Sequence, residues 1–245
     1  FGVAVYQFNI FVSTIIASFL PEGSISYLYY ADRLIEFPLG IFAVAVGTAV
    51  LPIMSRHAAM KNYDDLKDSL SFALRLVLFL TIPAMVGLIV LRIPIISILF
   101  QRGEFNSQTT LLTANALLYY SLGLWAIAGG RIVVPTFYSL QDTRTPVKIA
   151  IVTLFADIVL SIILAFPLGL RHGGIALAMS ISSTINIALL LIILRKRLGS
   201  IGGKKILLSV LKASISSTAM GIVVYLFCFR VPWDMVLGIK EKIFT

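Results

Sequence analysis

The chain has 245 residues, of which 59% are hydrophobic and only 13% are charged. Soluble domains carry about 25% charged residues, and a soluble protein of this length could not bury so much apolar surface. The composition therefore excludes an ordinary soluble domain and predicts a membrane protein. The net charge of +9 would suggest nucleic-acid binding in a soluble protein. Here most Lys and Arg lie between apolar stretches, where they set membrane topology and contact anionic headgroups, so no nucleic-acid partner is expected.

Seven stretches of the chain reach the ~20 mostly apolar residues that a membrane-spanning helix needs. They cover residues 2–20, 25–54, 70–100, 110–140, 146–168, 173–194 and 206–229. Short polar connectors that contain Gly, Pro, Asp or Asn separate these stretches, as is typical of turns. The predicted fold class is all-α, a polytopic transmembrane helix bundle of about seven spans.

Lys and Arg are divided unequally between two alternating sets of connectors. The connectors after the second, fourth and sixth spans hold ten of them, whereas those after the first, third and fifth hold two. Positive residues are retained on the cytoplasmic side, so the first set is predicted to be cytoplasmic. The first span then enters from the cytoplasm, and the polar segment from Asp234 to Lys242 lies outside.

The start of the chain is apolar, lacks Met and has no charged segment in front of it, so no signal peptide is expected. The odd number of predicted spans ends in a polar tail. We therefore expect the sequence to be an excerpt of a longer protein, with at least one further span.

The first candidate site lies in the second predicted span, where Asp32, Arg33 and Glu36 follow one another closely. Charged side chains at membrane depth cost ~2.5–3.5 kcal/mol to insert and mark function by default. Glu36 comes three residues after Arg33 and can pair with it on one helix face. A guanidinium keeps its proton and can donate two hydrogen bonds to two oxygens of one phosphate. This predicts an arginine that lines a polar cavity for an anionic group. The alternative is an internal ion pair that only joins two helices.

A second candidate is Arg131, which follows Gly129-Gly130 and precedes Pro135 near the end of a long apolar run. It could be a second cavity cation for an anionic substrate. The alternative is an arginine that extends its long side chain to the membrane surface.

A third candidate is a cation site around Asp157 and Ser161, which are four residues apart and share a helix face. Asn9 and Ser13 of the first predicted span would supply amide and hydroxyl neighbours. Such a carboxylate could bind Na⁺ or carry a proton. The alternative is hydrogen bonding between helices, worth ~0.6 kcal/mol on average.

No catalytic set is present in the sequence, which lacks the G-x-S-x-G, H-E-x-x-H and Walker A motifs. We therefore expect no enzyme activity and no cofactor. Cys228 is the single cysteine and lies in an apolar run, so neither a disulfide within the chain nor a metal site is expected.

Several short motifs, taken together, resemble one family along nearly the whole chain. They are ASFLPEGS (17–24), LYYADRL (28–34), EFPLG (36–40), GTAVLP (47–52), FQRGEF (100–105), FYS (137–139) and DTRTPV (142–147). In this order they resemble the C-terminal half of the MurJ/MviN lipid II flippases, members of the MOP exporter superfamily. Any one motif alone would be weak, but the ordered set is specific.

The resemblance implies an inverted-repeat transporter of about fourteen helices, in two lobes of about six helices with two extra helices. Residues 1–200 would form the C-terminal lobe, family helices 7 to 12. Residues 201–245 would form helix 13 and the start of an outer loop. The N-terminal lobe and the last helix would lie outside this chain.

The resemblance also implies a function in bacterial cell-wall synthesis at the inner membrane. The whole protein would move lipid II, the undecaprenyl-pyrophosphate-linked peptidoglycan precursor, from the cytoplasmic to the outer leaflet by alternating access. Its partners would be lipid II, membrane lipids and the missing N-terminal lobe. Arg33 is the one family arginine for the pyrophosphate that maps here. The lipid tail would lie in a groove between the span 206–229 and the missing last helix.

For the driving force, the resemblance leaves two possibilities. Asp157 and Ser161 fall where some members have a Na⁺ site, whereas Ser13 stands where some have Asp. The membrane potential is the other candidate, at ~2.3 kcal/mol per charge per 100 mV. Two other functions remain open: another exporter of the superfamily, for polysaccharide-lipids or drugs, and a membrane scaffold that transports nothing.

Overall fold

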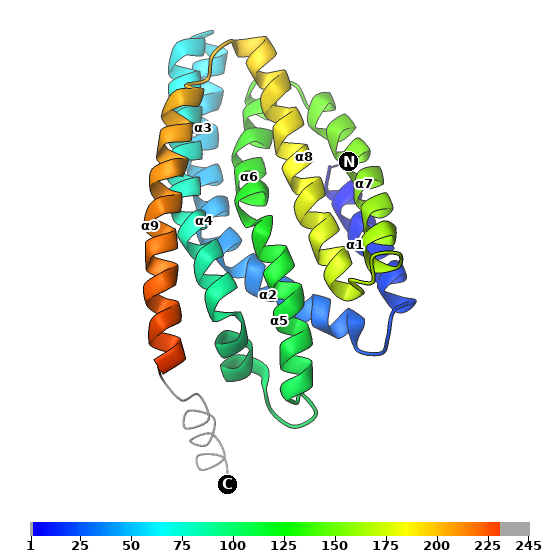
Figure 1. The fold of residues 1–245 in the computed structure, drawn as a ribbon. Helices are drawn as coiled ribbons and strands as arrows, with labels where there is room; N and C mark the ends of the chain where they lie inside the picture. Colours follow the sequence, from blue (N-terminus) through cyan, green and yellow to red (C-terminus); the bar gives the residue numbers. More distant parts are fainter. Residues whose placement is uncertain (1, 231–245) are drawn as a thin grey trace.

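The computed structural model describes residues 2–230 of the chain, and side chains between residues 7 and 228 (Figure 1). Asp234 to Lys242, predicted to lie outside the membrane, fall beyond the described residues. The described part consists of helices and their connectors. The elements are α1 (Gly2–Ser18), α2 (Ser24–Pro38), η1 (Leu39–Val44), α3 (Ala45–Ala59), α4 (Tyr63–Phe100), α5 (Ser107–Leu122), α6 (Leu124–Ser139), α7 (Arg144–Ala165), α8 (His172–Leu198) and α9 (Gly203–Arg230).

Each predicted span coincides with helical structure, which confirms the all-α prediction. Within the described residues, five helical segments are long and apolar enough to cross a membrane. They are Ser24–Ala59, Tyr63–Phe100, Arg144–Ala165, His172–Leu198 and Gly203–Cys228. The bent pair α5 and α6 makes a sixth span, and α1 contributes a shorter apolar helix, Gln7–Ser18. Helix α1 itself begins at Gly2 and ends at Ser18, within two residues of the predicted span 2–20.

The connectors 60–62, 140–143 and 199–202, with the Lys- and Arg-bearing helix ends beside them, lie at the same end of the bundle, at the top of Figure 1. This is the grouping that the charge distribution predicted. Arg197 in the last turn of α8 pairs with Asp142 of the connector 140–143 at an N–O distance of 2.7 Å. Burial raises the pKa of Asp142, but hydrogen bonds from Thr145 and the charge of Arg197 hold it below its ordinary value. The carboxylate therefore stays charged at neutral pH and keeps this link between connectors.

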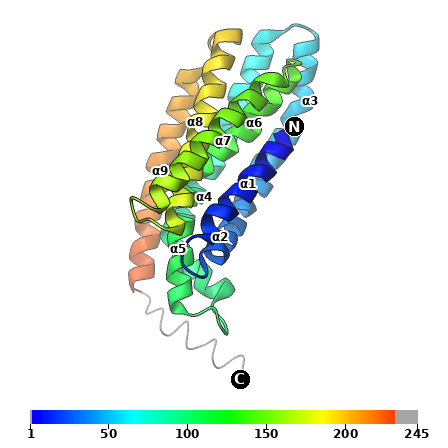
Figure 2. The ribbon, with the colours of Figure 1, turned by 90° about the vertical axis from the view of Figure 1, so that its right-hand side faces the viewer.

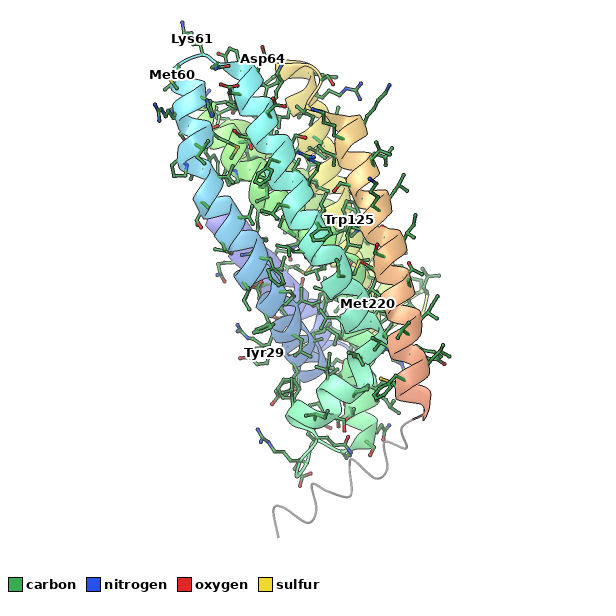
Figure 3. All side chains as sticks on the ribbon, turned by 90° about the vertical axis from the view of Figure 1, so that its left-hand side faces the viewer. Tyr29, Met60, Lys61, Asp64, Trp125 and Met220 are labelled. Atoms are coloured by element: carbon green, nitrogen blue, oxygen red, sulfur yellow. The ribbon has the colours of Figure 1, made fainter. Side chains whose placement is uncertain are left out.

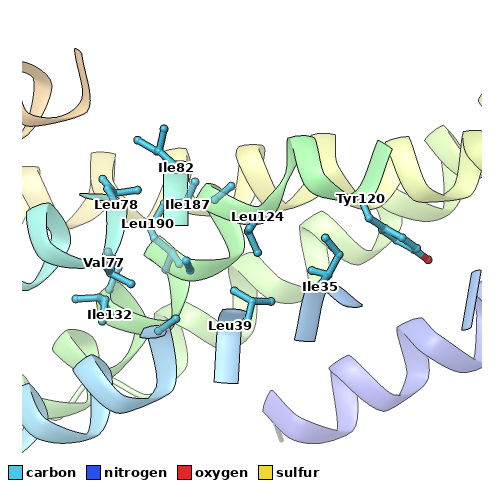
Figure 4. Packing of buried hydrophobic residues seen from close by; sticks show 14 of the residues in the cluster. Ile35, Leu39, Val77, Leu78, Ile82, Tyr120, Leu124, Ile132, Ile187 and Leu190 are labelled. Atoms are coloured by element: carbon cyan, nitrogen blue, oxygen red, sulfur yellow. The ribbon is translucent and has the colours of Figure 1, made fainter. Parts of the chain in front are cut away.

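Helix α6 lies in the middle of the bundle, where it contacts α3, α4 and α8. Around this centre, α9 packs on α4, and α1 packs on α7 (Figure 2). Leu39, Leu124, Ile132 and Leu190 are almost fully buried where these helices meet (Figure 4). Large apolar side chains remain exposed on the outer surface, among them Phe79, Phe155 and Ile215. Extensive exposed apolar surface of this kind marks contact with lipid.

The fourth predicted span, 110–140, is two helices bent by 44° at Gly123 rather than one. A Cβ at Gly123 would lie 2.7 Å from Ser180 Cα on α8, so glycine permits this close approach. Ser180 Oγ donates a hydrogen bond of 2.6 Å to the Tyr119 carbonyl beside the bend. Helix breaks are tolerated in membranes where neighbouring helices satisfy the freed backbone groups. The prediction of one continuous span missed this break because no proline marks it.

A second irregularity lies in the middle of the span Ser24–Ala59. Pro38 has no N–H and cannot continue the α-helical hydrogen bonds, and the π-helical segment η1 follows it directly. Short π-helical segments occur frequently at functional sites. Here the widened turn begins three residues after Glu36, so the irregular backbone adjoins the charged segment of α2.

The junction of α7 and α8 gives a test of the packing. A Cβ at Gly174 would lie 2.6 Å from the Ala165 backbone nitrogen, and backbone cannot move aside as a flexible side chain can. We expect Gly174→Ala to lower the free energy of unfolding by ~1–3 kcal/mol through overpacking. Thermal unfolding of the detergent-solubilised protein measures the effect.

The matched control is Gly87→Ala in α4, because no atom lies within 4 Å of a Cβ built there. The better helix propensity of alanine should leave stability unchanged or raise it by up to ~1 kcal/mol. Equal destabilisation by both substitutions would show that α7 and α8 do not meet as described.

Candidate functional site

Helix α2 places Asp32, Arg33 and Glu36 on neighbouring faces of one membrane-spanning segment. Arg33 is exposed, and its guanidinium carbon lies 4.8 Å from the centre of the Tyr29 ring. Figure 3 shows Tyr29 at the surface of α2. The predicted pairing of Arg33 with Glu36 is wrong. Side chains on a helix lean toward its N-terminus, so Arg33 reaches back over Tyr29 rather than forward to Glu36.

Glu36 instead pairs with Arg131 of α6, across 95 residues of sequence. Arg131 Nη2 donates to both carboxylate oxygens of Glu36, at 3.2 Å and 3.4 Å. The two side chains are 33% and 35% exposed, so the pair is accessible from a cavity. The alternative prediction, that Arg131 extends to the membrane surface, is therefore wrong. Arg33 has no ion pair among the described residues, and only the Tyr29 side chain and the more distant charges of Asp32 and Glu36 act on it.

A cavity of about 550 Å³ lies between α1, α3, α6, α7 and α8. Arg131 contributes to its wall, and its role as a cation for an anionic substrate stays a prediction. Neither Arg33 nor any other residue of α2 lines this cavity, so the prediction that Arg33 lines a polar cavity is not confirmed here. The polar side chains that share the wall with Arg131 are Asn9, Thr48, Thr153, Ser182, Ser183 and Asn186.

Asp157 is buried behind this cavity and joins three helices. Asn9 Nδ2 of α1 donates to Asp157 Oδ2 at 2.8 Å, and Ser182 Oγ of α8 donates to Asp157 Oδ1 at 2.9 Å. One turn before Asp157 on α7, Thr153 Oγ1 accepts a hydrogen bond of 3.0 Å from Asn186. The structure therefore brings Asn9 to Asp157, as the sequence predicted.

The other two predicted members of this site lie nearby but do not bind Asp157. Ser161 is buried one turn further along α7, and its hydroxyl has no hydrogen-bond partner among the described residues. Ser13 is half-buried one turn after Asn9 on α1. Ser182 takes the place that was predicted for Ser161. The signal for it in the sequence is the polar run from Ser180 to Asn186, a composition that is also typical of close packing between helices.

The Asp157 network gathers oxygen and amide groups around a carboxylate. Both of its donors are neutral, so no described side chain compensates the negative charge of Asp157. Hard cations prefer oxygen ligands such as carboxylate, hydroxyl and amide oxygens. This arrangement can hold either a monovalent cation or a proton.

The two serines near Asp157 provide a matched pair of substitutions. We expect Ser182→Ala to lower the free energy of unfolding by ~1–3 kcal/mol, because a buried acceptor loses its donor. Ser161→Ala should change it by less than ~0.5 kcal/mol, since its hydroxyl has no described partner to lose. Thermal unfolding in detergent compares the two, and a larger effect of Ser161→Ala would contradict the observed network.

Comparison with known proteins connects this geometry to one family. A family model described as Lipid II flippase MurJ matches residues 1–243. The Probable lipid II flippase MurJ of Vibrio cholerae is 44% identical over 190 residues, which are 78% of this chain and 36% of that protein. The Lipid II flippase MurJ of Burkholderia cenocepacia is 37% identical over 197 residues, 80% of this chain and 38% of that protein.

A solved structure of Lipid II flippase MurJ in an inward closed conformation has a TM-score of 0.81 to this chain at 35% identity. The alignment covers 97% of this chain and 49% of that chain. The chain thus spans little more than a third of the length of the curated relatives that it matches. From the family match over nearly its whole length, the fold and the apolar helices, the chain belongs to the MurJ family of multi-pass proteins in the bacterial inner membrane.

Proposed function

We propose that this chain is part of a lipid II flippase, in which Arg33 binds the pyrophosphate of the substrate. The observation that carries the proposal is an exposed guanidinium on a membrane-spanning helix without a carboxylate partner. Such a charge is expensive at membrane depth unless an anionic group approaches it. The relatives named lipid II flippases support lipid II as the source of that group.

The ion pair between Glu36 and Arg131 supports Arg33 indirectly. It fixes α2 against α6 one turn beyond Arg33, and it engages the Glu36 carboxylate. We propose that Asp32 and Glu36 orient the charged segment, and that Arg131 provides a second positive charge on the cavity side. The planar guanidinium of Arg33 can then donate hydrogen bonds to two phosphate oxygens at once.

We propose the division of the chain that the family resemblance implies. Residues 1–200 would form a transport lobe, and residues 201–245 would form an additional helix and the start of an outer loop. The partner would be an N-terminal lobe of the same protein. Rocking of the two lobes about the substrate would move lipid II from the cytoplasmic to the outer leaflet. The coverage of 36% to 38% of the relatives is consistent with a function that needs both lobes.

We further propose that Na⁺ drives transport through the group around Asp157. Asn9, Ser13 and Ser161, the residues predicted from the sequence, would share this task with Ser182. The support is a buried carboxylate with neutral partners on three helices, since relative movement of those helices would alter the site. The membrane potential is the alternative driving force.

Replacement of Arg33 tests the transport proposal. In the full-length protein, we expect Arg33→Ala to lower lipid II translocation in proteoliposomes at least about thirtyfold, because losing a buried charged contact costs ~2 kcal/mol or more. The same variant should not support growth of a strain depleted of its lipid II flippase. Arg33→Lys should recover part of the activity, since it keeps the charge but not the paired contacts.

The control for this experiment is Arg102→Ala, an exposed arginine in the connector after α4. It should retain normal translocation. Normal growth with Arg33→Ala would contradict the proposal and favour a membrane scaffold. Arg33-dependent movement of other lipid-linked glycans, without movement of lipid II, would identify a different exporter of the superfamily.

Sodium coupling has its own test in the same assay. At fixed membrane potential, replacing Na⁺ with K⁺ should slow lipid II translocation by the unmodified protein at least about tenfold. Translocation by Asp157→Asn should be slow in either salt. Asp68→Asn, on the exposed face at the start of α4, should keep the Na⁺ dependence. Equal rates in both salts for the unmodified protein would exclude sodium coupling and leave the membrane potential as the driving force.

A further inference from the structure

A second cavity, of about 470 Å³, lies between α4, α6, α8 and α9. Its wall is apolar apart from Ser214, and none of its lining side chains is charged. It shares no lining residue with the Arg131 cavity, because the two open on different faces of α6. Trp125 and Gly129 of α6 face the second cavity (Figure 3 shows Trp125 between α4 and α9).

The residues that line the second cavity follow α9 and α4 for about three helical turns. Its lining residues extend from Gly203 to Ser214 on α9 and from Leu74 to Met85 on α4. At 1.5 Å per residue, each of these segments is ~16 Å long. Half of a ~30 Å hydrocarbon core is ~15 Å, so the cavity matches the depth of one leaflet. Because Gly203 lies at the end with the basic connectors, that leaflet is the cytoplasmic one.

The far end of the second cavity is closed by contact between α9 and α4. A Cβ at Gly221 would lie 2.7 Å from Val86 Cγ1, and glycine here lets the helices touch. Small residues at helix interfaces commonly allow such close approach in membranes. The two helices therefore meet at Gly221, beyond Ser214, the last residue of α9 that lines the cavity.

The cytoplasmic end of the second cavity lies within a strongly basic segment. Arg195 comes one helical turn after the lining residue Leu191 on α8, and Lys204 directly follows the lining residue Gly203. Both side chains belong to exposed residues, as do Lys196 and Lys205. None of these four has an ion pair among the described residues.

The acidic residues at this end leave that positive charge largely uncompensated. Asp142 pairs with Arg197 at 2.7 Å, and Asp64 pairs with Lys67 at 2.6 Å. Asp68 is exposed at the start of α4. Basic pockets between membrane helices on the cytoplasmic side are typical binding sites for anionic lipid headgroups.

We propose that the second cavity binds an acyl chain of an anionic glycerophospholipid from the cytoplasmic leaflet, with the lipid phosphate held by Arg195 and Lys204. The apolar wall offers water too few hydrogen-bond partners, and its length suits a chain that crosses one leaflet. The bound lipid would fill the space between α9 and α6 and fix the position of α9. This inference does not rest on the transport proposal.

The test uses the purified full-length protein, with its native lipids removed. Phosphatidylglycerol and phosphatidylcholine with identical acyl chains are added, and binding is followed by native mass spectrometry. We expect phosphatidylglycerol to bind at least about tenfold more tightly than phosphatidylcholine. A phosphatidylglycerol with a photoactivatable acyl chain should label the peptides that contain Leu74 to Met85 or Ile206 to Ser214.

Two kinds of variant separate the headgroup contact from the acyl-chain contact. The double variant Arg195→Gln/Lys204→Gln should reduce the preference for phosphatidylglycerol to about twofold or less, whereas Lys61→Gln on the α3–α4 connector should preserve it. Val210→Trp should fill the cavity and weaken the binding of both lipids at least about tenfold. Leu208 is exposed on α9 and does not line the cavity, so Leu208→Trp should leave the binding of both lipids unchanged.

Three results would each overturn the proposal. They are equal binding of the two lipids by the unmodified protein, equal effects of Val210→Trp and Leu208→Trp, and labelling confined to other helices. Displacement of phosphatidylglycerol from these peptides by a tighter-binding polyprenyl diphosphate would also overturn it, since the cavity would then belong to the substrate. The glutamine variants replace exposed side chains, so their outcome stands even where Val210→Trp impairs folding.

Discussion

A charge or a backbone polar group inside a bilayer must find its partner within the protein, because lipid tails offer none. In this chain the partners come from helices that are distant in sequence. Glu36 meets Arg131 between α2 and α6, and Asp157 meets Asn9 and Ser182 between α1, α7 and α8. These contacts determine which helices approach one another, and the apolar core around α6 fills the space that they leave.

The same requirement explains why Arg33 and Arg131 differ in their partners. Arg131 has a carboxylate within 3.2 Å and contributes a compensated charge to a cavity wall. Arg33 has only the face of Tyr29, which attracts a cation more weakly than a carboxylate does. A carboxylate on Arg33 would compete with a phosphate for the same hydrogen-bond donors. Glu36 pairs with Arg131 instead, and Arg33 reaches back over Tyr29.

The sequence predicted those features that depend on local composition. Apolar length located the helices, and the Lys and Arg count grouped the connectors that lie at one end. It also singled out Asp157, because a buried carboxylate is costly wherever it lies. Features that depend on tertiary contact could not be predicted. Glu36 had a sequence neighbour in Arg33, and only the packing of α6 reveals Arg131 as its partner. The bend at Gly123 likewise depends on the close approach of Ser180 from α8.

Helix α6 separates two cavities, of which only one has a charged side chain in its wall, and this links the two proposals mechanically. Trp125 and Gly129 face the apolar cavity beside α9, while Gly130 and Arg131 face the Arg131 cavity beside α1 and α3. Interiors are close-packed, so a helix cannot move toward one side without changing the space on the other. A lipid that fills the apolar cavity would restrict the movement of α6 in that direction. The position of Arg131, and with it the ion pair that anchors α2, would then depend on what lies between α6 and α9.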